Sequence, residues 1–87
     1  MKYRSRADIS TEILKIADKG VSKTKIMYGA YLSFAQLKEY LKMLVDNGML
    51  SFDEKSTQYR TTEVGRNFIK TYERVGLMFD RRPIRSQ

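Results

Sequence analysis

Apolar residues recur every three or four positions near the start of the chain, which is the spacing of one face of a helix. They are Ile9, Ile13, Leu14, Ile16 and Ala17. Ser5 or Asp8 is a candidate cap at the beginning of this stripe, and Gly20 follows it as a residue type that commonly ends helices. The pattern therefore predicts a first helix from about Arg6 to Asp18.

Two more helices are predicted between Ser22 and residue 47, with a break at Gly29. The segment Ser33-Phe34-Ala35-Gln36 matches the capping box, in which the serine oxygen accepts from the glutamine amide and the glutamine side chain reaches back. The helix that begins there, the candidate recognition helix over about 33–47, buries one stripe formed by Leu37, Leu41, Leu44 and Val45. Two helices joined by a short turn that contains glycine are typical of a helix-turn-helix unit.

In the second half of the chain, apolar and polar residues first alternate as in a strand, and then return to helical spacing. Alternating runs on both sides of the polar segment "DEKST" predict a hairpin from about Leu50 to Thr61. Thr62 caps a last helix, predicted over about 62–79, and Pro83 stops it. This order predicts a mainly α (α+β) fold, a winged helix-turn-helix with a two-stranded wing. We expect one domain over residues 1–79, followed by a basic, flexible tail over 80–87.

Charge and composition narrow the possible functions. The chain has 87 residues, with 17 Lys and Arg against 10 Asp and Glu, which gives a net charge of +7. A basic surface favours a polyanionic partner, and nucleic acid is the first expectation before an acidic membrane surface. Neither an apolar run of about 20 residues nor a secretory signal is present, so we expect a cytoplasmic, nucleoid-associated protein with no membrane association.

The sequence contains no residues that suggest catalysis. Cys and His are both absent, which excludes disulfides and thiolate chemistry and removes the usual general base and the commonest metal ligand. The acidic pairs Asp53-Glu54 and Glu63-Asp80 show no spacing that places two carboxylates beside a proton carrier. We expect no enzyme activity, no metal and no cofactor.

The predicted helix-turn-helix gives a set of candidate contacts to nucleic acid. The second helix of such a unit faces base edges with its N-terminal residues, while the preceding helix crosses the backbone. The candidates on these two helices are Ser22, Lys23, Thr24, Lys25, Ser33, Phe34, Ala35, Gln36, Lys38 and Lys42. Lys55 and Arg60 add two basic positions on the wing, whose Asp53 and Glu54 repel phosphate.

Each of these candidates also has a purely structural interpretation. Gln36 either pairs with adenine or only closes the capping box. The lysines either contact phosphate and guanine or form a solvated face. Tyr28, Tyr31 and Tyr40 resemble a base-stacking row, but they alternate with core positions, so we expect them to pack in the core and the turn.

The last helix carries more apolar surface than a small domain needs. Val64, Phe68 and Ile69 are expected to pack within the domain, whereas the positions beyond them would leave an exposed apolar patch. The alternative is that this stripe folds back on its own domain. We expect a homodimer through Phe68, Tyr72, Val75, Met78 and Phe79.

Two longer segments add a resemblance. "SKTKIMYGAYLSFAQLKEYLKMLVDNGML" and "QYRTTEVGRNFIKTYE" resemble the archaeal ArnR-like winged helix-turn-helix family, and especially its small basic chromatin-associated DNA-binding proteins. The resemblance implies a double-stranded DNA-binding protein, with residues 33–42 in the groove, the hairpin as wing and dimerisation through the last helix. A transcriptional regulator or chromatin-associated protein is therefore the first expectation. A winged helix used as a protein-interaction module is the alternative, because a fold alone does not fix a function.

Overall fold

The computed structural model describes residues 4–80, with side chains described for residues 4–78. Residues 81–87 of the expected tail and the side chain of Phe79 therefore lie outside the described residues. The elements in chain order are α1 (Arg6–Ile16), α2 (Lys23–Gly29), α3 (Phe34–Asp46), β1 (Leu50–Asp53), β2 (Gln58–Thr61) and α4 (Glu63–Asp80). This order confirms the predicted winged helix-turn-helix fold, with each boundary within about two residues of its expected place.

Two reciprocal capping boxes fix where α1 and α3 begin. Ser5 Oγ accepts from the Asp8 amide at 3.0 Å, and Asp8 Oδ2 accepts from the Ser5 amide at 3.0 Å. Ser33 Oγ accepts from the Gln36 amide at 3.1 Å, and Gln36 Oε1 accepts from the Ser33 amide at 3.0 Å. Each box satisfies two backbone donors that the helix itself leaves unpaired. The two candidate caps of the first helix, Ser5 and Asp8, therefore form one capping box together.

One hydrophobic core joins the three N-terminal helices and the base of the hairpin. Its buried members are Ile9, Ile13, Leu14, Ala17, Ile26, Ala30, Leu32, Leu37, Tyr40, Leu41, Leu44 and Leu50. The side chain of Thr61 is buried at the edge of this core, and its Oγ1 donates to the carbonyl of Leu14 at 2.6 Å. This bond ties the end of β2 to the end of α1.

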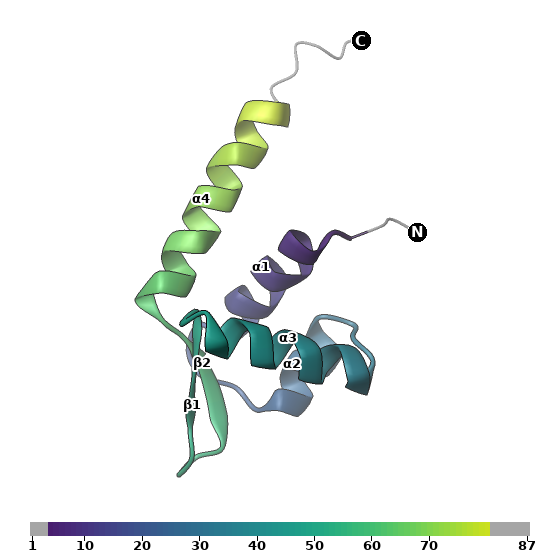
Figure 1. Ribbon diagram of the computed structural model, residues 1–87, viewed down its shortest axis with the longest axis vertical. Coiled ribbons are helices and arrows are strands. Elements are labelled where there is room, and N and C mark those ends of the chain that lie inside the picture. Colours follow the sequence, from purple (N-terminus) through teal and green to yellow (C-terminus); the bar gives the residue numbers. More distant parts are fainter. Residues whose placement is uncertain (1–3, 81–87) are drawn as a thin grey trace.

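The hairpin is a short antiparallel pair that extends away from the helices (Figure 1). Leu50 pairs with Thr61, and Phe52 pairs with Tyr59. Val21, in the linker between α1 and α2, exchanges two backbone hydrogen bonds with Tyr59, at 2.9 and 2.7 Å. The start of α2 is thereby held against the wing.

The last helix begins in close contact with the domain and then leaves it. Thr62 Oγ1 accepts from the Gly65 amide at 3.1 Å, which confirms the predicted cap, and it also donates to the carbonyl of Gly48 at 2.6 Å. Salt bridges join α4 to α1 and to the residues just after it, from Lys15 to Glu73 at 2.7 Å and from Arg66 to Asp18 at 3.2 Å. Beyond them α4 diverges from α1 (Figure 1).

Three side chains expected inside the protein are exposed. Val64 lies on the solvent side of α4, because Gly65 faces the domain at a point where the carbonyl oxygen of Met49 comes too close for a side chain. Tyr28 is exposed on α2, and Tyr31 is 83% exposed in the turn between α2 and α3. Tyr31 has φ 55°, a left-handed conformation that reverses the chain and directs the ring outward. The core position expected for these two tyrosines is therefore wrong, whereas Tyr40 is buried as expected.

Candidate nucleic-acid interface

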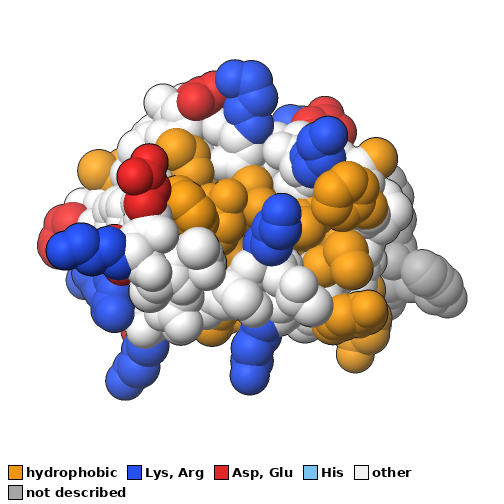
Figure 2. Space-filling view, turned by 90° about the horizontal axis from the view of Figure 1, so that it is seen from below, with side chains coloured by type: hydrophobic (Ala, Val, Ile, Leu, Met, Phe, Trp, Pro, Cys, Tyr) orange, Lys and Arg blue, Asp and Glu red, His pale blue; other side chains and the backbone are white. Residues whose placement is uncertain are grey.

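The N-terminal end of α2, the exposed side of α3 and the wing border one groove. Its volume is about 460 Å³, and its walls are mostly apolar. It is lined by Lys23, Phe34, Leu37, Lys38, Leu41, Lys42, Val45, Asp46, Phe52 and Tyr59. Figure 2 shows this side of the molecule, with hydrophobic side chains gathered across the middle and Lys and Arg side chains among and around them. We call this feature the α3–wing groove.

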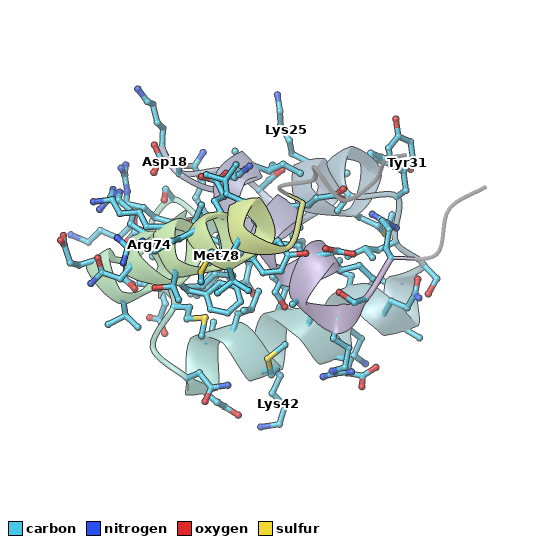
Figure 3. The ribbon with its side chains drawn as sticks, turned by 90° about the horizontal axis from the view of Figure 1, so that it is seen from above. Asp18, Lys25, Tyr31, Lys42, Arg74 and Met78 are labelled. Carbon is cyan, nitrogen blue, oxygen red and sulfur yellow. The ribbon has the colours of Figure 1, made fainter. Side chains whose placement is uncertain are left out.

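The groove brings together four of the residues predicted from the sequence, namely Lys23, Phe34, Lys38 and Lys42. A neighbouring depression of about 390 Å³ adds Ser22 and Thr24 beside the wing residue Phe52. Lys25 does not join them, since Figure 3 shows Lys25 and Lys42 pointing to opposite sides of the molecule. Ser33, Ala35 and Gln36 are exposed at the start of α3 and line neither hollow.

The two basic candidates on the wing occupy different places. Lys55 is exposed in the turn that joins the strands. Arg60 lies on the face of the hairpin opposite Phe52 and Tyr59, because successive side chains of a strand alternate. Its guanidinium is close to Gly20, where a Cβ would be 3.3 Å from Nη2. The wing therefore presents aromatic rings to the groove and its arginine to the other side.

Ion pairs reduce the free charge of α3. Lys42 Nζ lies 2.9 Å from Asp46 Oδ2, and this hydrogen bond together with the carboxylate charge raises the pKa of Lys42. Glu39 Oε2 lies 3.4 Å from Arg6 Nη1. The helix has Lys38 and Lys42 as its basic residues against Glu39 and Asp46 as its acidic ones. The part of α3 that lines the groove carries Lys38 and Lys42 against Asp46, and Lys23 of α2 adds a further positive charge.

The wing also carries a carboxylate that stays ionised. Asp53 Oδ2 accepts from Ser56 Oγ at 2.7 Å and from the Ser56 amide at 3.3 Å. These hydrogen bonds lower the pKa of Asp53. A negative charge therefore remains at the hairpin turn near neutral pH, beside the positive charge of Lys55.

Three residues that shape this site, Arg4, Phe52 and Tyr59, are not among the candidates predicted from the sequence. Arg4 Nη1 donates to Glu12 Oε1 at 2.6 Å and to the carbonyl of Ala30 at 2.7 Å, and its Nη2 donates to the carbonyl of Tyr31 at 3.3 Å. Arg4 thereby fastens the turn before α3 to α1. Phe52 and Tyr59 pack with ring centroids 4.7 Å apart on the groove side of the wing. The strand alternation predicts their shared face, but no local signal in the sequence predicts the contacts of Arg4.

Two other kinds of site are absent from the described part of the chain. Among residues 4–78 no cluster of acidic, His or Cys side chains is placed to hold a metal ion. None of the described helices is both long and apolar enough to cross a bilayer.

Comparison with known proteins agrees with this architecture. The family model described as winged helix-turn-helix matches residues 3–79. An uncharacterised protein from Methanocaldococcus jannaschii is 31% identical over 77 residues, which cover 86% of this chain and 77% of that protein. The crystal structure of Sso10a-2, a DNA-binding protein from Sulfolobus solfataricus, matches with a TM-score of 0.79 and 25% identity, over 90% of this chain and 84% of that one. The chain therefore belongs to the winged helix-turn-helix family.

Proposed function

We propose that this protein binds double-stranded DNA and acts as a transcriptional regulator or chromatin-associated protein, with α3 in the major groove. The observation that carries the proposal is the exposed N-terminal half of α3, which follows α2 at a tight turn and lies beside a wing. This is the docking geometry of helix-turn-helix proteins. The likeness to Sso10a-2, described as a DNA-binding protein, supports the same role. We further propose that the chain belongs to the archaeal ArnR-like family and that it is associated with the nucleoid.

The proposed contacts divide into two groups. Residues at the start of α3 face the base edges, and Lys38 and Lys42 lie farther along the same helix. Lys23, together with Ser22 and Thr24, meets the phosphate backbone at the edge of the groove, beside the start of α2. Lys25 and Arg60 point to other sides, and Lys55 lies in the exposed turn of the wing. These three contact a duplex only where it extends past the groove.

Dimerisation completes the proposed DNA-binding unit. Val75, Leu77 and Met78 are 43%, 71% and 70% exposed in the single chain, at the end of α4 that leaves the domain. A two-fold pair joined there presents two α3 helices, which suits half-sites about 34 Å apart. The proposed interface comprises Phe68, Tyr72, Val75, Met78 and Phe79.

One observation favours a second candidate, a protein-interaction module. The α3–wing groove is largely apolar, and hydrophobic grooves of this kind also accept helices of partner proteins. In that case the lysines at its edge would select an acidic partner. A titration with DNA separates the two functions, because a groove devoted to a protein partner gives no salt-dependent binding to duplex.

The test is fluorescence anisotropy of a labelled random-sequence duplex, titrated with protein at several salt concentrations. A dimer that neutralises about six phosphates gives a slope of roughly −5 in log affinity against log salt. Lys23→Ala should reduce the steepness by about 0.9 for each phosphate that the variant no longer neutralises. Lys70→Ala removes the same charge from an exposed site on α4 and should leave the slope nearly unchanged. Absence of binding by micromolar protein at low salt contradicts the proposal.

A further inference from the structure

We propose that α3 distinguishes base pairs chiefly through the methyl group of thymine, which Phe34 and Ala35 contact in the major groove. This inference rests on the proposed function and names the kind of duplex that the protein prefers, one with thymines at the positions under the start of α3. It is carried by the exposure of these two apolar side chains and by the contacts that already occupy Gln36 and Glu39 beside them.

Phe34 and Ala35 are the first two residues of α3 and are both exposed. Phe34 is 59% exposed, so most of its ring is available for an apolar contact. The N-terminal residues of a recognition helix are the ones that reach base edges. The two side chains nearest the bases are therefore apolar, and neither donates nor accepts a hydrogen bond.

The polar side chains that follow are already engaged. Gln36 Oε1 accepts from the Ser33 amide at 3.0 Å, so a two-point contact with adenine through its oxygen and nitrogen requires the capping box to open. Lys38 Nζ lies 5.5 Å from the centroid of the Phe34 ring, and Glu39 pairs with Arg6. Readout by hydrogen bonds thus competes with contacts that the free protein has already formed.

The major groove offers one apolar feature to such a surface. Each base pair presents donors and acceptors there, and only the thymine C5-methyl is a hydrocarbon group in unmodified DNA. Phe34 also lines the α3–wing groove, where its ring continues the apolar wall formed by Leu37 and Phe52. A methyl group placed against Phe34 is thereby removed from water on more than one side.

The experiment changes the DNA by one methyl group at a time. A duplex of about 20 base pairs containing thymine is compared with the same duplex containing uracil, which keeps every hydrogen bond and lacks the C5-methyl. We expect binding about fourfold weaker for each contacted methyl, the ratio that corresponds to burying one carbon group. A G·C-rich duplex with 5-methylcytosine in place of cytosine should bind more tightly than its unmethylated form, because the methyl occupies the same groove position.

Variants assign the effect to Phe34. Phe34→Ala removes an exposed ring at the first turn, and circular dichroism checks that the fold is kept. It should lower the thymine-to-uracil affinity ratio by about the fourfold that one contacted methyl contributes, whereas Lys23→Ala should weaken both duplexes equally and keep the ratio. Equal affinity of the unaltered protein for the two duplexes overturns the inference, and so does an unchanged ratio in Phe34→Ala. Either result leaves the proposed function standing. Absence of binding to every duplex overturns both.

Discussion

Gly65 and Gly76 are both helical glycines of α4, but they have different surroundings. A Cβ at Gly65 would lie 2.5 Å from the carbonyl oxygen of Met49 and 2.7 Å from Thr61 Cγ2, whereas nothing lies within 4 Å of the same position at Gly76. The Met49 oxygen belongs to the backbone and also accepts the Thr62 amide at 3.0 Å, so it cannot move aside cheaply. The close approach of α4 to the domain therefore depends on the missing side chain at Gly65.

We predict opposite effects for alanine at these two sites. Gly65→Ala should lower the free energy of unfolding by about 1–3 kcal/mol, because the extra methyl forces a backbone shift. Gly76→Ala should leave it unchanged or raise it by up to about 1 kcal/mol, since alanine is the better helix former. Urea unfolding followed by circular dichroism at one protein concentration measures both. A Gly65→Ala variant as stable as the parent protein would show that α4 does not dock as described.

At the scale of single residues, the sequence predicts contacts between residues that are close together in the chain. Ser33 and Gln36 are three positions apart, and their reciprocal capping box could be predicted because both partners lie within one helical turn. Hydrophobicity predicts an inward position for Val64, yet the helix faces the domain with Gly65. The side of α4 that faces the domain is set by the carbonyl of Met49, which lies outside the helix and is not part of its hydrophobic pattern. Contacts of this kind appear only when the elements are assembled.

At the scale of elements, the orientation of α3 depends on how its preceding turn is held. The turn contains Tyr31 in a left-handed conformation, which is unfavourable for a residue other than glycine. Arg4 donates hydrogen bonds to the carbonyls of Ala30 and Tyr31 and to Glu12 of α1. These bonds stabilise the turn and connect it to α1. The order of helices was predictable, but this bridge joins residues 26 positions apart and has no local signature.

We predict that Arg4→Ala loosens this turn. The carbonyl of the buried Ala30 loses its charged donor, which should lower the free energy of unfolding by about 1–3 kcal/mol. Arg4→Lys should recover only part of this loss, since a lysine lacks the fork that reaches two carbonyls and a carboxylate together. Hydrogen exchange gives a local measurement, in which the amides of Tyr31 and Leu32 should exchange faster in Arg4→Ala than in the parent protein.

The same exchange experiment contains its own control. The Arg66 amide donates to the carbonyl of Thr62 at 2.9 Å in the first turn of α4, far from the α2–α3 turn in the chain. Its exchange should follow only the change in global stability. Uniform acceleration of every amide would mean that Arg4 contributes to overall stability without positioning α3.

At the scale of the whole molecule, α4 gives the protein its elongated form. The principal extents are 51 × 28 × 19 Å, and Figure 1 shows α4 rising beyond the three N-terminal helices. Its hydrophobic pattern predicted a helix of nearly the observed length, but a pattern within one chain does not reveal what covers the far end. Leu77 is as exposed as Met78, but helical spacing puts it on the opposite side of α4 from Val75 and on the same side as Lys70. Leu77 therefore lies outside the surface that Val75 and Met78 form.

We predict that this surface joins two copies of the protein. Val75 and Met78 are exposed near the end of α4, and the half-buried Phe68 and Tyr72 precede Val75 at helical spacing. Exposed apolar patches of this kind are seldom left uncovered in monomers. Val75→Asp would place a charge within the proposed interface and should convert a dimer to a monomer at tens of micromolar protein, measured by size exclusion with light scattering. Lys70→Asp, on another side of α4, introduces the same carboxylate and should leave the dimer intact.

The two variants should also differ in their binding to DNA, because a monomer loses the second α3 helix and hence the preference for two half-sites about 34 Å apart. A monomeric mass for the unaltered protein, unchanged by Val75→Asp, would exclude this interface.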